Sequence, residues 1–492
     1  MESPTDMSLP RVLVTSCREL LTLAPRVPFG HEHSREPRRP GRVALVGGAL
    51  MVLSLGLWAL WTYLNRRDMW HMLDLSVYHD AVHRLRDGDR IYTENYGKWE
   101  LPFIYPPISG LLFYVVLPLG FAGLKWFMAS LSLLSLFAVV WASWGMLGYR
   151  RGAGRFGVSA ATFAVVLWLE PVEWTLVWGQ INLLLLALIV LDLALPDDRR
   201  YKGIGVGVAA GLKLTPAIFV VYLLITRRFR AAAVASGAFV GTVLVGLVAA
   251  PSASAYYWAN LVSISGKVNS KLSVGTLNNQ SVQGMFTRML GDGGAATGLW
   301  LLLCLVIGAL GLLAAARASL YGNELVGVVV TGGLSLFVSP ISWSHHWVWV
   351  VPVFVLLTHT ALTRARPLWW WLTGTFFVFF AAWPMRLNVF GDWDGAQTLQ
   401  PWGLIWLAPR DGDRERHWTP IEFVLGNGYL IAGIVLTLTL VLHILRDRTA
   451  LPTLPAPGAA STEAASAGEG AAETGTPESP APDPVSGGSG RR

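Results

Sequence analysis

Charged residues and cysteines are both scarce in this sequence, and each shortage limits what the chain can be. Only 14% of its 492 residues are charged and 53% are hydrophobic, whereas roughly a quarter of the residues in a soluble domain are charged. The two cysteines lie in unrelated surroundings, Cys17 in the N-terminal part and Cys304 inside a hydrophobic run. The composition therefore excludes an ordinary soluble domain and argues against a disulfide framework or a cysteine metal cluster.

Long hydrophobic runs are abundant instead. They recur along the chain at about 20 residues each, the length that a helix needs to cross a bilayer. The net charge of +7 indicates no nucleic-acid partner, because the basic residues lie in short loops between these runs, where they set orientation. We predict an all-α polytopic membrane protein with about 10–12 transmembrane helices.

Composition divides the chain into three parts. Residues 1–42 are rich in arginine and proline, and we expect a disordered cytoplasmic leader without a cleavable signal peptide. Residues 43–445 carry the hydrophobic runs and form the membrane domain. Residues 446–492 consist mainly of small and polar residues with little to bury, which predicts a disordered cytoplasmic tail.

Two topologies are open for the first half of the membrane domain. They differ in whether the stretches 108–120 and 203–225 cross the membrane. If neither crosses, all the basic residues of the two following loops face the cytoplasm, as the positive-inside rule requires; these are Arg150, Arg151, Arg155, Arg199, Arg200 and Lys202. We favour this version, in which 203–225 is a re-entrant hairpin with Lys213 near its tip.

The first outer loop, 65–107, is too polar to span a bilayer, yet it is rich in aromatic residues. Its apolar side chains from Trp70 to Leu85 follow helical spacing. We interpret the segment as an amphipathic helix on the membrane surface, with Asp74 and Tyr78 at the edge of its apolar stripe. Asp74 then points toward a cavity.

Further polar side chains converge on the outer face, where both topologies place the loops 65–107, 251–297, 340–346 and 384–420. Amides and tryptophans together suit a sugar, because amides bond hydroxyls and indole faces stack on C–H surfaces. We predict sugar or acceptor contacts from Tyr78, Tyr105, Gln180, Asn182, Asn279 and Gln280. His345 and His346 begin a later span. Lys213 is a charge inside an apolar run, which makes it a functional candidate.

Each of these residues also has an ordinary structural explanation. An aspartate in a loop is usually solvated, and Asp80, Asp87 and Asp89 compete with Asp74 within the same segment. Interfacial histidines often cap or anchor helices, tryptophans form membrane belts, and Lys213 could snorkel or pair with a carboxylate. Position alone does not decide between the alternatives.

An ordered set of short motifs adds a resemblance. DLSVYHDA, LRDGDRIYTE, FIYPP, WGQINLLL, GLKLTP and SPISWSHHWVW follow one another along the chain. Together they resemble glycosyltransferase family 87, a group of GT-C-fold membrane enzymes that includes actinobacterial α-1,2-mannosyltransferases, over residues 43–445. The resemblance implies a polyprenol-phosphate mannose donor, used on the extracytoplasmic side, and a phosphatidylinositol mannoside or lipomannan-type acceptor. It assigns the family's aspartate to Asp74 and its histidine to His345 or His346.

The implied chemistry is a single displacement with inversion, for which Asp74 is the expected general base. Cations must stabilise the departing polyprenyl phosphate, and we predict His345, His346, Lys213 and Arg288 for this role. We expect no cofactor and no metal, because the sequence has no DxD pair beside a predicted strand; the DGD triplets at 87–89 and 411–413 resemble turns.

Two other functions remain open from the sequence. A lipid or sugar transporter or flippase would explain the many spans and the intramembrane lysine, although we find no internal hydropathy repeat. A GT-C enzyme that uses a different lipid-linked sugar, such as a pentose, is the other alternative. Membrane lipids are partners in every version.

Overall fold

The structure is a computed structural model, and it describes residues 35–85, 90–264, 266, 274–387, 398–410 and 414–446. The predictions for most of the leader, for Cys17, Asp87 and Asp89, for the second DGD triplet and for almost all of the C-terminal tail lie outside the described residues. The described chain is mainly helical, which confirms an all-α polytopic membrane protein.

The first half of the chain consists of helices with one small hairpin. Its elements are α2 (Pro40–Leu64), α3 (Arg66–Met69), α4 (Leu73–Val82), α5 (Arg90–Thr93), β1 (Asn95–Tyr96), β2 (Leu101–Pro102), α6 (Pro107–Val116), η2 (Leu117–Leu119), α7 (Gly120–Met146), α8 (Ala153–Val166), α9 (Glu170–Trp178), α10 (Asn182–Leu193), α11 (Ile204–Leu212), η3 (Thr215–Ala217) and α12 (Ile218–Ile225).

The second half has the same character and a second antiparallel strand pair. Its elements are α13 (Phe229–Ala249), α14 (Pro251–Ala259), α16 (Val282–Leu290), α17 (Gly294–Leu320), α18 (Glu324–Val338), η4 (Ser344–Trp349), α19 (Val350–Arg364), α20 (Pro367–Phe380), β3 (Trp383–Leu387), β4 (Thr398–Trp402), η5 (Leu404–Leu407), η6 (Arg414–His417), α21 (Pro420–Gly426) and α22 (Gly428–Arg446).

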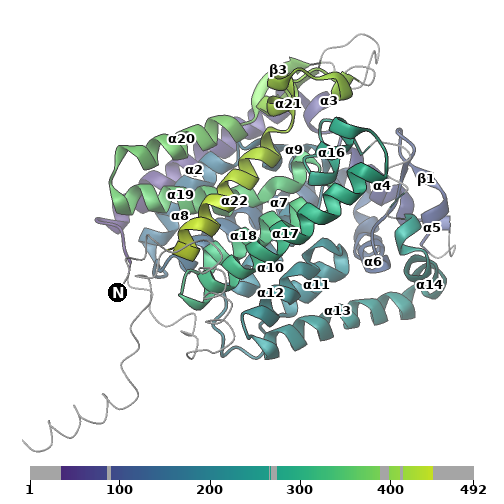
Figure 1. The fold of residues 1–492 in the computed structure, drawn as a ribbon, viewed down its shortest axis with the longest axis horizontal. Helices are drawn as coiled ribbons and strands as arrows, with labels where there is room; N and C mark the ends of the chain where they lie inside the picture. Colours follow the sequence, from purple (N-terminus) through teal and green to yellow (C-terminus); the bar gives the residue numbers. More distant parts are fainter. Residues whose placement is uncertain are drawn as a thin grey trace, which may run out of the picture. The chain divides into compact units, whose positions relative to one another are not determined.

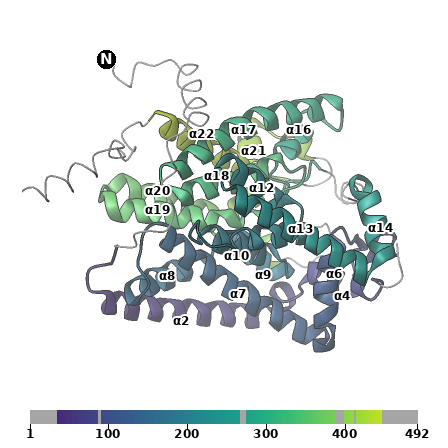
Figure 2. The same cartoon turned by 90° about the horizontal axis from the view of Figure 1, so that it is seen from below.

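Long helices pack side by side, and the short elements gather at one end of them. Figures 1 and 2 show α4, α6 and α14 at the same end of the bundle, and Figure 1 shows α5 there as well. Figure 2 also shows α2, α7 and α8 as neighbours. The α2–α8 contact is close, since a Cβ on Gly47 would lie 2.1 Å from the carbonyl oxygen of Gly157. Small residues at helix contacts allow this approach in membrane proteins.

The number of long spans is smaller than the sequence suggested. By length and composition, 5 described helices can cross a membrane, and the bent pair Pro420–Gly426 and Gly428–Leu442 would make 6. Several predicted spans are shorter apolar helices of 10–17 residues, among them Asn182–Leu193 and Glu324–Val338. The reason is that turns and helix breaks divide apolar runs that look continuous in the sequence.

Residues 203–225 form a helical hairpin. A Cβ on Gly203 would lie 2.2 Å from the carbonyl oxygen of Ala231, and one on Gly211 would lie 2.1 Å from Oγ1 of Thr242. Helix α11 therefore runs alongside α13 in the same direction, and η3 and α12 bring the chain back to the start of α13. Lys213 lies at the reversal, in extended backbone between α11 and η3. This is the hairpin that the charge distribution favoured.

The other uncertain stretch, 108–120, does not form a span of its own. Helix α6, η2 and α7 follow one another without a loop, and Pro107–Met146 counts as one candidate span. Gly120 has φ +64°, a conformation suited to glycine, at the junction with α7. Ser109 Oγ donates to the carbonyl oxygen of Leu212 over 2.7 Å. The start of α6 thus contacts the reversal of the hairpin.

The helix that carries Asp74 differs from its prediction in length and surroundings. It begins at Leu73 rather than Trp70, because Met72 has φ +47° and interrupts the helix. Its residues Leu75, Val77 and Ala81 are buried among α6, α7 and α9. Helix α4 is therefore packed at the end of the bundle by its apolar face, with Asp80 exposed on the other face. Its position on a membrane surface stays a prediction.

A buried ion-pair network fastens the base of the hairpin. Arg228 donates through Nη1 to Oε1 of Glu324 over 2.7 Å and through Nε to Oδ1 of Asp197 over 3.0 Å. Lys202 Nζ donates to the same Asp197 oxygen over 2.9 Å, and Tyr222 OH donates to Glu324 over 2.9 Å. The arginine and glutamate are almost fully buried. Both ends of the hairpin are thereby joined to α18.

We predict that Glu324→Gln destabilises the protein by about 3 kcal/mol, because it leaves the buried Arg228 with only the Asp197 carboxylate, which Lys202 also uses. Thermal unfolding of the detergent-solubilised protein measures the effect. The matched control is Glu94→Gln, which removes a half-exposed pair with Arg84 and should cost less than about 1 kcal/mol. Equal melting midpoints for the two variants would show that the buried network contributes little.

Candidate active site

Two close backbone approaches bring Asp74 and Gln180 together. The Met72 amide donates to the carbonyl oxygen of Val177 over 3.1 Å, which fastens the entry of α4 to the end of α9. Gly179 has φ +69°, and a Cβ there would lie 2.7 Å from Cβ of Leu75. A glycine is required at 179 for both reasons, and the turn that it makes places Gln180 directly beside Asp74.

Asp74 belongs to a hydrogen-bonded network with two tyrosines. Gln180 donates through Nε2 to Oδ2 of Asp74, and its Oε1 accepts from Tyr78 OH over 2.9 Å and from Tyr105 OH over 3.3 Å. Tyr78 OH also lies 2.9 Å from Tyr105 OH, and its single proton can be donated to only one of these two oxygens at a time. Gln180 is thus fixed by both ends of its amide, and it orients the carboxylate of Asp74.

The surroundings of Asp74 favour its protonated form more than water does. Burial raises its pKa from 3.8 to about 6, although the hydrogen bond from Gln180 and the positive charge of Lys213 act in the opposite direction. A carboxylate with such a pKa remains ionised near neutral pH and is a stronger base than a solvated aspartate. These are the properties required of a general base.

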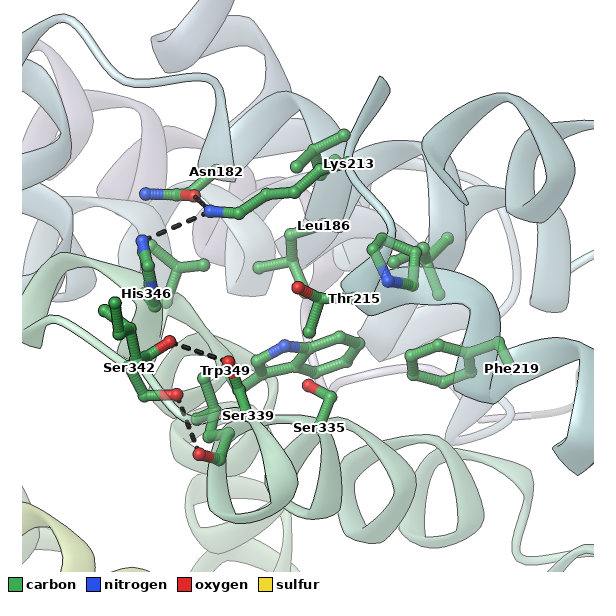
Figure 3. Close-up of a pocket in the computed structure, with 16 residues that line it drawn as sticks. Asn182, Leu186, Lys213, Thr215, Phe219, Ser335, Ser339, Ser342, His346 and Trp349 are labelled. Carbon is green, nitrogen blue, oxygen red and sulfur yellow. Dashed lines mark hydrogen bonds between the residues drawn. The ribbon is translucent and has the colours of Figure 1, made fainter. Parts of the chain in front are cut away.

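Lys213 reaches the site from the reversal of the hairpin. Its Nζ donates to Oδ1 of Asn182 over 3.3 Å, lies 3.1 Å from Nε2 of His346 and lies 5.8 Å from the centre of the Tyr105 ring. Figure 3 shows Lys213, Asn182 and His346 meeting at one side of a small cavity of about 60 Å³, which continues past Ser342. Three elements far apart in sequence therefore hold one ammonium group.

Hydrogen bonds to its carbonyl oxygen hold His345 in place, and one nitrogen of its ring has no protein partner among the described residues. Its carbonyl oxygen accepts from Thr175 Oγ1 and from Asn182 Nδ2, each over 3.1 Å. Its ring lies near those of Trp178 and His346, with centroid distances of 6.3 and 4.8 Å. The buried Nε2 has no hydrogen-bond partner among the described residues, so it is available to a ligand.

These groups surround one large cavity of about 550 Å³, a size typical of small-ligand sites. The sequence-predicted residues that line it are Asp74, Tyr78, Tyr105, Gln180, Lys213, His345 and His346. Asn182 stands just behind them and holds Lys213. A carboxylate, an ammonium group and two imidazoles thus face one apolar, aromatic chamber, an arrangement that can deprotonate a hydroxyl and stabilise an anion.

Comparison with known proteins agrees with this chemistry. Residues 103–340 match the model of glycosyltransferase family 87. The chain is 32% identical over 408 residues to a polyprenol-phosphate-mannose-dependent α-(1-2)-phosphatidylinositol pentamannoside mannosyltransferase of Mycobacterium tuberculosis, covering 81% of this chain and 91% of that protein. The chain belongs to glycosyltransferase family 87.

Two proteins of Mycolicibacterium smegmatis are also similar. One has the same descriptive name and is 31% identical, with 75% of this chain and 88% of that protein covered. The other is a polyprenol-phosphate-mannose-dependent α-(1-2)-phosphatidylinositol mannoside mannosyltransferase, 31% identical over 65% of this chain and 76% of that protein. No solved structure matches the chain.

Three other predicted residues lie away from the cavity of this family 87 chain. Arg288 is buried and donates to the carbonyl oxygens of Thr276 and Asn279 and to Oδ1 of Asn427. Asn279 bonds backbone atoms of the 340–342 segment, and Gln280 donates to backbone carbonyls of Leu277 and Gly426. None of the three lines the cavity. The observed contacts of these three side chains hold loops together, and we assign none of the three to the donor or the acceptor.

Among the rivals to Asp74, Asp80 is exposed and pairs with His79. It does not line the cavity. In the described part of the chain no group of three or more histidine, cysteine, aspartate or glutamate side chains is arranged to hold a metal ion.

Sequence reasoning missed the far side of the cavity of this family 87 chain. Trp174, Trp178, Trp406, Arg410 and Glu415 line it there. Buried Glu170 orients one of these rings, since its Oε1 accepts from Trp406 Nε1 over 3.0 Å and its Oε2 accepts from Tyr429 OH over 3.1 Å. The sequence did offer one indication of this wall, because Glu170 and Glu173 lie within an apolar stretch. Burying a carboxylate there is unfavourable unless it forms specific hydrogen bonds.

Proposed function

We propose that this protein transfers mannose from polyprenol-phosphate mannose to a mannosylated phosphatidylinositol-type glycolipid, forming an α-1,2 linkage with inversion. The donor and acceptor follow the names of the family 87 relatives, which match across most of their length. The observation that carries the proposal is that Asp74, Lys213 and the two histidines line one cavity. No cofactor takes part in it.

The reaction is a single displacement at the anomeric carbon of the donor. The acceptor hydroxyl oxygen forms the new bond to this carbon, and the bond from the carbon to the phosphate oxygen breaks with its electron pair. The hydroxyl proton passes to Asp74, and polyprenyl phosphate leaves. A β-linked donor then gives an α-linked product. Asp74 has the raised pKa that suits this step.

The leaving phosphate needs positive charge and hydrogen-bond donors. Lys213 supplies an ammonium group held by Asn182 and His346. His345 offers its unpartnered Nε2 at the cavity. We assign both residues, with His346 as the side chain that orients the lysine, to the donor phosphate. Tyr78, Tyr105 and Gln180 orient Asp74 and contact the sugar.

The site belongs to the outer face of the membrane in this proposal, with both termini in the cytoplasm. Most segments that line the cavity belong to the loops 65–107, 251–297, 340–346 and 384–420, which both sequence topologies assign to that face, and the favoured topology places the 170–182 segment there as well. A lipid-linked donor fits the location, since its prenyl chain remains in the bilayer while its head group enters the cavity.

We predict that Asp74→Asn lowers mannosyl transfer by about 100-fold or more, because the amide cannot accept the proton. The assay uses purified protein, polyprenol-phosphate mannose and a mannosylated lipid, and thermal unfolding verifies the fold. Asp80→Asn is the matched control, since Asp80 is exposed, and its activity should stay within roughly twofold. An Asp74→Asn enzyme with more than about a tenth of wild-type activity would remove the residue from this role.

The pH dependence of transfer should follow the ionisation of Asp74. Because the base must be deprotonated, kcat/KM should be constant above the pKa of about 6 and fall as the pH drops below it, about tenfold per unit. In the wild type the hydrogen bond from Gln180 lowers the pKa of Asp74. The Gln180→Leu variant lacks this bond, so the acidic limb of its pH profile should move to higher pH. A limb near pH 4 in the wild type would contradict the assignment.

Lys213→Met should reduce both transfer and the slow hydrolysis of the donor by water, roughly tenfold to a hundredfold, because a charged hydrogen bond to the phosphate is lost. Release of polyprenyl phosphate without acceptor measures hydrolysis. Lys213→Arg should retain more of it than Lys213→Met. Unchanged hydrolysis with failed transfer would instead assign Lys213 to the acceptor.

A further inference from the structure

A continuous row of aromatic rings leads away from His345 along one wall of the cavity. The Trp178 ring lies 6.3 Å from that of His345 and stacks on Trp174 at 5.2 Å. Trp174 in turn stacks on Trp406 at 5.7 Å. All these residues line the same cavity. Trp174 and Trp406 are only 2% and 6% exposed, so the row forms a packed, rigid wall of the cavity.

The row ends at a pair of oppositely charged side chains. The guanidinium of Arg410 lies 5.3 Å from the centre of the Trp406 ring, and its Nη1 donates to the carbonyl oxygen of Trp406 over 2.8 Å. The carboxyl group of Glu415 accepts the backbone N–H of Leu277. Arg410 and Glu415 both line the cavity.

A second observation points to a ligand along this wall. Trp174 is only 2% exposed and lines the cavity, yet its indole N–H has no hydrogen-bond partner among the described residues. A buried indole N–H normally finds a partner. A ligand hydroxyl lying on the tryptophan row would supply one.

The charges decide the kind of ligand that fits. A phosphate at this end would meet the carboxylate of Glu415 as well as the guanidinium of Arg410, so much of the attraction would cancel. A neutral sugar suits the pair better, because its hydroxyl groups donate to the carboxylate and accept from the guanidinium. Its C–H groups contact the apolar wall that the tryptophan row forms.

We propose that Trp174, Trp406, Arg410 and Glu415 form a second sugar subsite, which binds the acceptor sugar unit next to the one that is glycosylated. The inference rests on the proposed function and adds to it that the enzyme recognises at least two sugar units of its acceptor. Transfer efficiency therefore depends on acceptor length, independently of the donor.

The test compares two synthetic acceptors, octyl α-mannoside and an octyl dimannoside, with purified full-length enzyme and polyprenol-phosphate mannose. For the wild type we expect kcat/KM to be at least about tenfold higher with the dimannoside, a preference that corresponds to about 1.4 kcal/mol. The difference should lie mainly in KM, because the subsite contacts a part of the substrate that does not react.

Two variants assign this preference to the subsite. Arg410→Gln and Glu415→Gln should each reduce the ratio between the acceptors to within about threefold, while donor hydrolysis without acceptor stays at the wild-type rate. Arg416→Gln is the matched control, since Arg416 comes from the same segment but pairs with Asp292 at the surface. It should keep the full preference.

The inference fails if the wild type has the same kcat/KM for both acceptors. It also fails if the variants lower kcat/KM for both acceptors by the same factor. It also fails if Arg410→Gln affects only acceptors that carry a phosphate, which would assign the arginine to that phosphate. These outcomes differ from failure of the proposed function, in which the wild type transfers no mannose to either acceptor. If Arg410→Gln does not fold, the wild-type ratio and Glu415→Gln still decide.

Discussion

The burial of one ammonium group governs how this site is built. Lys213 lies within an apolar helical domain, where an isolated charge is costly. The chain offsets that cost by reversing the 203–225 segment at the lysine and by bringing Asn182 and His346 to its Nζ. Since these partners come from α10 and η4, the position of the lysine depends on the mutual packing of three elements. The cavity that Lys213 shares with Asp74 follows from that packing.

The short helix α9 links this arrangement to the rest of the chain. Glu173 accepts from Trp58 of α2 over 3.2 Å, while Glu170 accepts from Trp406 and Tyr429. Between these anchors the helix presents Trp174 and Trp178 to the cavity. Helix α9 ends at Gly179, beside which Gln180 meets Asp74. A nine-residue helix thus joins the first span, the reaction centre and the C-terminal part of the described chain.

Much of this could be predicted from particular residues. The apolar run interrupted by Lys213, Thr215 and Pro216 predicted a hairpin, because a charge and a proline both disfavour a continuous span. The resemblance of the DLSVYHDA and SPISWSHHWVW segments directed attention to Asp74 and the two histidines, all of which line the cavity. Asn279, Gln280 and Arg288 looked equally suitable in sequence. They bond loops together instead, because polar side chains serve a backbone as readily as a ligand.

Sequence alone determined that the chain is a multi-pass helical membrane protein of glycosyltransferase family 87, since hydropathy and ordered motifs are local properties of the chain. The tertiary structure decided which polar groups share a cavity, that α4 is a packed helix, and that Trp406 and Arg410 extend the wall begun by Trp174. Such contacts join residues more than 200 positions apart. No local pattern specifies them, because they depend on how helices of similar composition pack against one another.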